Sequence, residues 1–323
     1  MPHVPPPPLP GCAVLVTGGA GFIGSHVADA LLARGHRVVV LDDLSTGDER
    51  RVPQEARFVK ADVREPGLDA LLSEEKVDTV FHLAAQVDVR RSVDEPVLDA
   101  EVNVLGTIRV AQACGRAGVA HVVFSSSGGA VYGEPVGEKA DEDHPLNPCS
   151  PYGVAKLAAE KYLAALAPES GFLLSVLRYA NVYGPRQDGR GEAGVVGIWM
   201  NRLLSGQDAV VNGDGGQTRD FVHVADVVGA NQAAFLHRIP GVFNVGTGIE
   251  TSVKDLYGLV AAACGSGAPP RFGPSKAGEQ RRSVLDPARA RRALGLTELV
   301  PLEGGMRATA EWFRLHRAQL GLG

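Results

Sequence analysis

Tyr152 and Lys156 are the two residues whose types and spacing most directly suggest chemistry. They lie four positions apart in the segment Ser150-Pro-Tyr-Gly-Val-Ala-Lys156, and residues at that spacing share one face of a helix. A cation beside a phenol lowers the pKa of the phenol, which would make the tyrosine a usable base near neutral pH. The same spacing also commonly joins a half-buried ring and a solvated charge. The elements that position the pair therefore decide between these interpretations.

A glycine-rich stretch near the start of the chain predicts a dinucleotide-binding turn. An apolar strand is expected at 12–16, Gly18, Gly21 and Gly24 follow it, and a helix is expected at 27–34. Glycines at this spacing allow a tight turn and a close approach of a pyrophosphate to the backbone. The N–H groups at the start of the helix can then bind the phosphates.

An acidic pair follows the second expected strand, at 37–41. Asp42 lies eighteen residues after Gly24, where a carboxylate can bind the ribose of an adenosine. Asp42 and Asp43 would repel a 2′-phosphate, so the sequence favours NAD over NADP as the cofactor.

The alternation of strands and helices predicts an α/β fold with a doubly wound parallel sheet, Rossmann-like in its organisation. Further strands are expected at 58–61, 77–84, 121–124 and 173–179, and a long helical segment at 96–117. Ligands of such sheets bind beyond the carboxyl ends of the strands. The residues expected along that edge include Asp62, Val63, Ala84, Ala85 and the serines at 125–127.

Ser125, Ser126 and Ser127 come at the end of one of these strands. Serines in this place often shape a turn. They could also provide a hydrogen bond to a substrate hydroxyl, because Tyr152 and Lys156 begin the next helix at the same edge of the sheet.

Length and composition predict two domains after a short leader. Residues 1–10 are rich in proline and are expected to be a disordered leader without the features of a signal peptide. Residues 11–180 are expected to form the cofactor-binding domain. Residues 181–323 are expected to form mainly a smaller α/β substrate-binding domain, with some segments returning to the first. The loop at 187–194 would lie over the substrate, and His223 is expected to be a packed, hydrogen-bonded histidine.

Charge and cysteine content exclude several classes of function. The formal net charge is −5, which argues against a nucleic-acid partner. No apolar run approaches the roughly 20 residues that span a bilayer. The four cysteines are scattered and are expected to be free thiols of a cytoplasmic protein, with no metal site among them.

Taken together, these residues resemble the extended short-chain dehydrogenase/reductase superfamily, in the nucleotide-sugar branch of the NAD-dependent epimerase/dehydratase family. The resemblance is strongest to the UDP-glucose 4-epimerases. It runs from Val14 to about Asp286. The motifs that carry it lie at 17–24, 42–47, 152–156, 177–185, 218–226 and 244–248.

The resemblance implies a role for each matching residue. Tyr152 would be the catalytic base, Lys156 would bind the nicotinamide ribose, and Ser127 or Ser126 would bridge the tyrosine and a sugar hydroxyl. The implied cofactor contacts are Gly18, Gly21, Phe22, Ile23, Gly24, Asp42, Asp43, Leu44, Ser45, Thr46, Gly47, Asp62, Val63, Leu83, Ala84, Ala85, Ser125, Tyr152, Lys156 and Tyr179. The implied substrate contacts are Ser127, Asn181, Arg219, Lys276, Glu279 and Ser283.

Two positions depart from or vary within the family pattern. Lys276 stands where members usually have an arginine, so the charge is kept and the planar fork is lost. Ser283 stands where members have either a tyrosine, which excludes N-acetylated sugars, or a small residue. Serine leaves room for an N-acetylhexosamine as well as a hexose.

The resulting expectation is NAD-dependent epimerisation at C4 of a UDP-hexose, by oxidation to a 4-keto sugar and return of the hydride. UDP-N-acetylglucosamine 4-epimerase or dual specificity is the first alternative, followed by a UDP-glucuronate epimerase or decarboxylase. A 4,6-dehydratase is disfavoured because Gly128 and Gly129 replace the Asp-Glu pair of those enzymes. A non-catalytic NAD-binding sensor would be expected to lack part of the Ser, Tyr and Lys set. Family members usually form homodimers through the helix after Pro96 and the helix of Tyr152.

Overall fold

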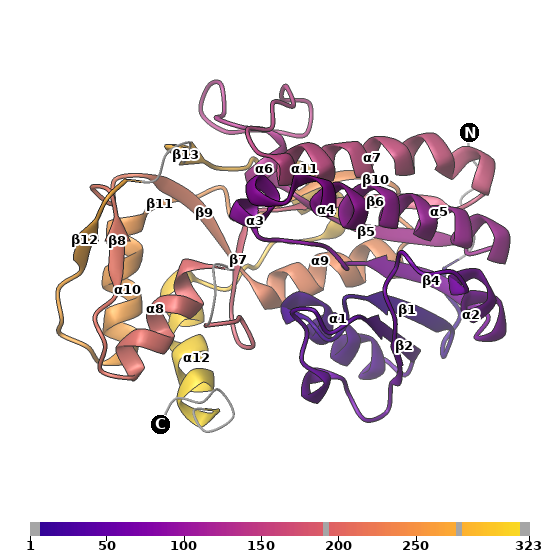
Figure 1. The fold of residues 1–323 in the computed structure, drawn as a ribbon, viewed down its shortest axis with the longest axis horizontal. Helices are drawn as coiled ribbons and strands as arrows, with labels where there is room; N and C mark the ends of the chain where they lie inside the picture. The colour runs from indigo at the N-terminus through magenta and orange to yellow at the C-terminus, as the bar shows by residue number, and fades with distance from the viewer. Residues whose placement is uncertain (1–6, 190–193, 276–279, 317–323) are drawn as a thin grey trace.

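A seven-stranded, all-parallel sheet forms the larger half of the molecule (Figure 1). The structure, a computed structural model, describes residues 7–189, 194–275 and 280–316. The strands run in the order β10 (Gly241–Val245), β6 (Leu173–Tyr179), β5 (His121–Ser127), β4 (Val77–His82), β1 (Ala13–Thr17), β2 (Arg37–Asp42) and β3 (Arg57–Lys60). The winding direction reverses between β1 and β4, which is where ligands of such sheets bind. The predicted α/β, doubly wound fold is confirmed.

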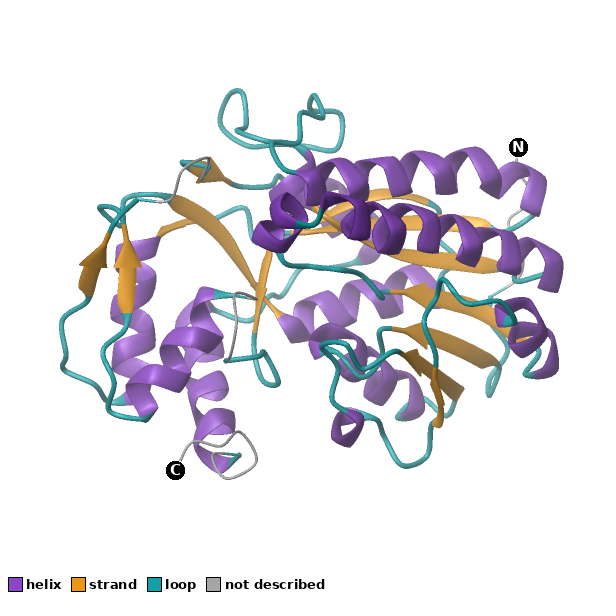
Figure 2. Cartoon of the chain, in the orientation of Figure 1, coloured by secondary structure: helices purple, strands orange, loops and turns teal. Residues whose placement is uncertain are grey.

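Helices cover both faces of this sheet (Figure 2). One face carries α1 (Phe22–Leu32), α9 (Val224–Leu236) and α11 (Ala288–Leu294), and the other carries α2 (Leu68–Glu74), α5 (Gly106–Ala117) and α7 (Pro151–Ser170). Successive residues of a strand point to opposite faces, so Val14 and Val16 pack on the α1 side while Leu15 packs on the α5 side. A strand buried on both faces reads as a continuous apolar run, which is why the sequence indicated these strands.

The helical segment expected at 96–117 consists of three parts. They are α4 (Pro96–Ala100), the π-helical stretch η2 (Glu101–Leu105) and α5, with the short helix α3 (Val89–Asp94) before them. A π-helical turn widens the helix by one residue and rotates the side chains that follow it. This changes which residues face the sheet, and hydrophobic spacing alone did not indicate it.

The smaller half of the molecule lies beside the carboxyl edge of the large sheet (Figure 1). Four short strands pair there: β7 (Asn181–Tyr183), β9 (Thr218–His223), β11 (Glu250–Ser252) and β13 (Arg282–Ser283). A separate pair, β8 (Val210–Asn212) and β12 (Arg271–Gly273), packs with α8 (Val195–Leu204), α10 (Val253–Cys264) and α12 (Leu302–Leu315). Their core contains Trp199, Met200, Leu256, Met306 and Phe313.

Most remaining expectations on local structure agree with the structure. The helix after the glycines begins at Phe22, five residues before its expected start. Two short helical segments, η1 (Glu49–Arg51) and α6 (Gly128–Val131), were not expected. All four cysteines are free thiols. Within the part of the chain that is described, no helix combines the length and apolarity that crossing a membrane requires.

Candidate active site

Tyr152 and Lys156 lie in the first two turns of α7, at the carboxyl edge of the large sheet. Pro151 occupies the first helical position, and the Ser150 hydroxyl accepts a hydrogen bond from the Gly153 N–H at 3.1 Å, which caps the helix. Nζ of Lys156 lies 6.0 Å from the centre of the Tyr152 ring and donates a hydrogen bond to the Ser125 carbonyl at 3.0 Å. Tyr152 is half-buried and Lys156 is buried.

Ser126 and Ser127 have different partners. Ser127 is hydrogen-bonded to the Tyr152 side chain. The Ser126 hydroxyl, which is 3% exposed, donates a hydrogen bond to Oε1 of Glu160 at 2.5 Å. Because side chains alternate along a strand, Ser126 shares the face of β5 with Phe124, which packs in the core beneath α7. Of the two serines that remained open from the sequence, Ser127 is therefore the one beside the phenol.

The glycine turn between β1 and α1 has the close packing that a dinucleotide turn requires. Gly18 has φ +70°, and a Cβ there would lie 2.7 Å from the Ala84 nitrogen. A Cβ on Gly24 would lie 2.2 Å from the Gly18 carbonyl oxygen. Gly21 is the N-cap of α1 and has no side chain to satisfy the first N–H groups of the helix. These features fit a pyrophosphate held by the backbone at the helix start.

Asp42 ends β2 beside this turn. Its carboxylate accepts hydrogen bonds from the Ala20 and Leu44 N–H groups at 3.0 and 2.9 Å, and burial raises its pKa. Asp43 is exposed and accepts from the Ser45 N–H at 2.8 Å. Both carboxylates thus lie at the expected edge of the sheet, and Asp42 also holds the loop over which a ribose would sit.

Three of the substrate contacts expected in the second half of the chain lie on one small sheet. Asn181 is on β7, Arg219 on β9 and Ser283 on β13, and Ser283 lies opposite Arg219 in the register of the strands. A Cβ at Gly129 would lie 3.9 Å from Nδ2 of Asn181, 3.9 Å from Oγ of Ser283 and 4.0 Å from Oγ of Ser127. Residues more than 150 positions apart in the sequence therefore surround the open side of Gly129.

Comparison with known proteins identifies the family of this chain. Residues 14–246 match the NAD dependent epimerase/dehydratase family. A UDP-glucose 4-epimerase of Mycolicibacterium smegmatis is 49% identical over 306 residues, which cover 93% of this chain and 98% of the relative. The chain belongs to the NAD dependent epimerase/dehydratase family.

Two solved structures of the family are similar to this protein over nearly their whole length. The UDP-glucose 4-epimerase of Thermotoga maritima, solved with UDP-glucose, has a TM-score of 0.91 at 43% identity, covering 94% of this chain and 99% of that chain. The UDP-glucose 4-epimerase of Thermus thermophilus, solved with NAD, has a TM-score of 0.88 at 44% identity with the same coverage.

Burial acts on the pKa values of both Tyr152 and Lys156. Burial raises the pKa of Tyr152 to about 12; the hydrogen bond with Ser127 lowers it and the Asp99 carboxylate raises it. Burial lowers the pKa of Lys156 to about 8, against the Asp99 and Glu160 carboxylates, which raise it. Desolvation of the phenolate is thus the largest cause acting on the Tyr152 pKa in the protein without its ligands.

A buried polar chain behind the glycine turn was not predicted from the sequence. The Thr17 hydroxyl lies 2.8 Å from Nδ1 of His82, and Nε2 of His82 lies 3.0 Å from the Thr107 hydroxyl. Thr17 also accepts a hydrogen bond from the Ala84 N–H at 3.2 Å. These hydrogen bonds fix the end of β4, where Leu83, Ala84 and Ala85 were expected to contact the cofactor. The sequence feature that could have indicated this network is Thr17, a small polar residue directly before Gly18.

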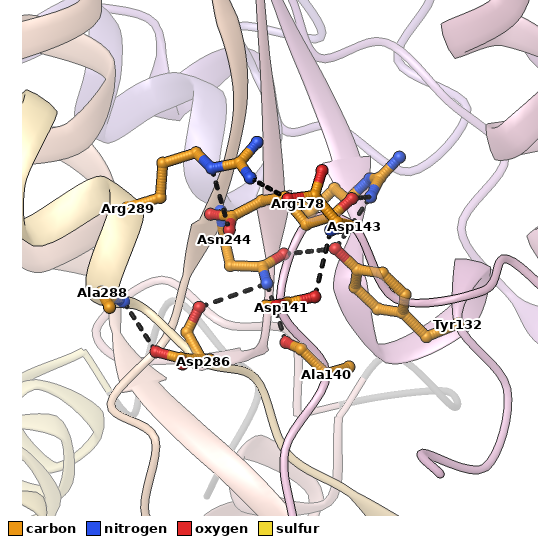
Figure 3. A network of polar contacts seen from close by, with 10 residues as sticks. Tyr132, Ala140, Asp141, Asp143, Arg178, Asn244, Asp286, Ala288 and Arg289 are labelled. Carbon is orange, nitrogen blue, oxygen red and sulfur yellow. Dashed lines mark hydrogen bonds and ion pairs between the residues drawn. The ribbon is translucent and has the colours of Figure 1, made fainter. Parts of the chain in front are cut away.

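A second network joins the serine strand to the rest of the molecule. Arg178 on β6 forms a buried ion pair with Glu160 and donates a hydrogen bond to the Tyr132 hydroxyl at 2.8 Å. Tyr132 donates to Oδ1 of Asn244 at 2.7 Å, and Asn244 in turn donates to the Ala140 carbonyl at 2.9 Å (Figure 3). The contacts continue through Asp286 to Ala288, while Arg289 binds Asp143.

The remaining predicted residues have other surroundings. Both carboxylate oxygens of Asp62 accept hydrogen bonds from Arg64, which lowers the pKa of Asp62. Tyr179 is buried and its hydroxyl is bonded to Asn231 and to Ser125. Nδ1 of His223 accepts from the Ala225 N–H at 3.2 Å, which agrees with a packed histidine.

The other predicted cofactor contacts lie in the first turn of α1, in the loop after Asp42 or against Gly106. Phe22 and Ile23 are half-buried in the first turn of α1, and Val63 is buried against Gly106. Thr46 is exposed, and Gly47 packs against the Asp42 carboxylate. Lys276 and Glu279 lie outside the described residues, as do residues 1–6 of the expected leader and part of the loop expected at 187–194.

Proposed function

We propose that this protein is a UDP-hexose 4-epimerase that uses NAD and carries out its proton transfers with Tyr152, Ser127 and Lys156. The relatives of 49% and 43% identity are UDP-glucose 4-epimerases, and one solved relative contains UDP-glucose. The observation that carries the proposal is the meeting of Ser127, Asn181 and Ser283 around Gly129, beside a tyrosine–lysine pair and a dinucleotide turn.

Each residue has a distinct task in the proposed reaction. Tyr152 takes the proton of the sugar C4 hydroxyl and later returns it, and Ser127 hydrogen-bonds to the phenol and aligns the hydroxyl. Lys156 places a positive charge beside the phenol, which stabilises the phenolate when the proton moves. Bound NAD supplies reversible acceptance of a hydride from C4. Asn181 and Arg219 would bind the diphosphate of the nucleotide.

The most direct test is product identification. The purified protein is incubated with UDP-glucose, UDP-galactose, their N-acetylamino forms and UDP-glucuronate, and the products are identified by NMR. We expect C4 inversion without added reductant. Loss of carbon dioxide or water without inversion would overturn the proposal.

Tyr152→Phe tests the assignment of the base. The variant keeps the ring and removes the hydroxyl, so turnover should fall by about 10²–10⁴-fold while NAD stays bound. Product formation by NMR and NAD content by absorbance check the two parts. Full turnover in the variant would remove Tyr152 from the role of base.

Activity on N-acetylated UDP-hexoses is a second candidate, favoured by Ser283. This serine is 6% exposed and lies on β13 opposite Arg219, at the position where the resemblance implies either a tyrosine or a small residue. The same product assay distinguishes the two: inversion of the N-acetylamino sugars at rates similar to the plain hexoses would indicate dual specificity.

We further propose that the protein is a homodimer. Apolar side chains are exposed on the adjacent elements α3, α4 and α7, including Val89, Val93, Val97, Val154 and Tyr162. Contiguous exposed apolar surface marks an interaction site. Sedimentation equilibrium should give twice the chain mass of 33.8 kDa. A monomer at micromolar concentration would contradict this proposal and would not bear on the proposed epimerase function.

A further inference from the structure

Asp99 on α4 is a buried carboxylate that the proposed reaction does not use. It is 1% exposed. Its Oδ1 accepts hydrogen bonds from Nε2 of Gln86 and from Nδ2 of Asn103, both at 2.9 Å. Its Oδ2 is also buried and has no hydrogen-bond partner within the described part of the chain. A buried charge with an unsatisfied oxygen is costly unless another charge compensates for it.

Lys156 is the cation that acts on the pKa of Asp99. Helix α4 packs against α7, and the two side chains are both buried and interact electrostatically. Lys156 itself is a buried cation whose described hydrogen bond goes to a neutral carbonyl, that of Ser125. The Asp99 charge also acts on Tyr152. The carboxylate with one unsatisfied oxygen and the buried ammonium therefore each act on the pKa of the other.

The other titratable groups that interact with Lys156 either have another charged partner or are neutral. Glu160 acts on Lys156 but forms the ion pair with Arg178 at 2.6 Å. Burial lowers the pKa of His82 on β4 to about 3, and the Lys156 charge lowers it further, so His82 is neutral. Among the described residues that face Lys156, Asp99 is thus the anion without an arginine partner.

We propose that Asp99 is a positioning residue that sets the charge state of Lys156: its buried carboxylate keeps Lys156 an ammonium ion, so that a positive charge stands beside Tyr152 when the phenolate takes the substrate proton. The inference rests on the reaction proposed above. Hydrogen bonds from Gln86 and Asn103 to Oδ1 hold the carboxylate in place. Neither of these bonds involves Oδ2.

The direction of the effect follows from the sign of the charge. An anion near a lysine raises the lysine pKa, and an anion near a tyrosine raises the tyrosine pKa. Removing the charge of Asp99 should therefore lower both. Burial would then act on Lys156 with less opposition, so that more of it is neutral at pH 7.

Asp99→Asn separates this role from a structural one. The amide oxygen can accept both hydrogen bonds that Oδ1 accepts, and the amide nitrogen replaces the oxygen that lacks a partner. The matched control is Asp94→Asn, which removes an exposed carboxylate at the end of α3. The pKa of Lys156 is measured by the ¹³Cε resonance of labelled lysine, assigned by its absence in Lys156→Met.

We expect the pKa of Lys156 to fall by about one unit in Asp99→Asn and to stay unchanged in Asp94→Asn. In the pH profile of kcat, the limb at high pH should move to lower pH by a similar amount. A structural role alone predicts an equal loss of kcat at every pH. An unchanged lysine pKa in folded Asp99→Asn would overturn the inference.

Thermal stability gives a test that needs no activity. In the Lys156→Met background the Asp99 charge has no partner, so adding Asp99→Asn should raise the thermal midpoint relative to Lys156→Met alone. The same substitution in the natural chain should leave the midpoint lower or unchanged. Equal shifts in both backgrounds would contradict coupling between the two charges. A lysine pKa shift in a protein that epimerises no UDP-sugar would sustain the charge coupling and reject the proposed function instead.

Discussion

Ser126 and Ser127 are adjacent in the sequence, and the strand gives them different surroundings. Ser126 faces the core beneath α7 and binds Glu160, whereas Ser127 lies at the strand end and is bonded to Tyr152. At the scale of single residues, the alternation of side chains along β5 thus assigns the two hydroxyl groups to different tasks.

Ser127→Ala and Ser126→Ala form a matched pair of variants. The first removes the hydroxyl next to the phenol, and kcat should fall about 10²-fold or more. The second breaks a buried hydrogen bond to a carboxylate, so the free energy of unfolding should fall by about 1.5–3 kcal/mol while kcat changes much less. Steady-state kinetics and urea unfolding measure the two effects. The reverse pattern would mean that Ser126 is the serine of the reaction.

At the scale of elements, the turn from β1 to α1 shows the effect of backbone contact most directly. Gly24 lies in α1, yet a Cβ there would collide with the Gly18 carbonyl, a backbone atom that cannot move aside as a flexible side chain could. The same turn leaves the first N–H groups of α1 without a side-chain cap, an arrangement that favours binding of a phosphate. Binding and packing therefore depend on the same glycines.

Gly24→Ala should open this turn. We expect the affinity for NAD, measured by isothermal titration calorimetry, to fall at least about tenfold, together with a lower thermal midpoint. Gly258→Ala on α10 is the control, because a Cβ there meets no atom within 4 Å. It should leave NAD affinity unchanged and stabilise the helix by up to about 1 kcal/mol. Tight NAD binding by Gly24→Ala would contradict the assigned turn.

The Glu160–Arg178 ion pair connects the catalytic helix α7 to strand β6 within the core. The two side chains are 5% and 4% exposed and lie 2.6 Å apart. Glu160 lies four residues after Lys156, so the helix that carries the lysine is held on the sheet through this contact. The pair also holds Tyr132 and thereby the network that reaches Asn244 (Figure 3).

Arg178→Met should lower the free energy of unfolding by about 3–5 kcal/mol, because it leaves Glu160 buried without its partner. Arg307→Met is the control: it removes an exposed pair with Glu303 on α12 and should cost less than about 0.5 kcal/mol. Urea unfolding gives both values. A similar small change in both variants would show that the buried pair is not the connection inferred here.

At the scale of the whole molecule, buried histidines make stability depend on pH. His121 begins β5 and is fully buried, with Nε2 2.7 Å from the Ser175 hydroxyl, and burial lowers its pKa to about 3. The unfolded chain binds the proton near pH 6.5. Between pH 6.5 and 3 the unfolded state therefore holds more protons, so this contribution to stability is complete above pH 6.5 and is lost as the pH falls toward 3.

His121→Gln should flatten that dependence. The variant lacks the group that protonates on unfolding, so its free energy of unfolding should fall less between pH 7 and pH 4 than that of the natural chain. Urea unfolding at several pH values gives the two slopes. Parallel curves would mean that His121 does not contribute to the loss of stability in acid.

Much of the fold and part of the site could be predicted from the sequence, because those features are local. The sheet strands appear as apolar runs, the Gly18–Gly24 turn has its own spacing, and Tyr152 and Lys156 share a face of one helix. The π-helical stretch at 101–105 and the Asn231 partner of Tyr179 were missed. Each of these depends on packing between segments that the local pattern does not report.

The sequence by itself determined the family, the dinucleotide turn and the tyrosine–lysine pair, since nearby residues in one strand, turn or helix specify each of them. Only the tertiary structure decided that Ser127 rather than Ser126 meets the phenol, that Asn181 and Ser283 lie around Gly129, and that the Asp99 charge acts on Lys156. These relations depend on strand register and on burial. Both are set only when distant segments pack together. Packing also excludes water around charged and hydroxyl groups, and this changes their pKa values.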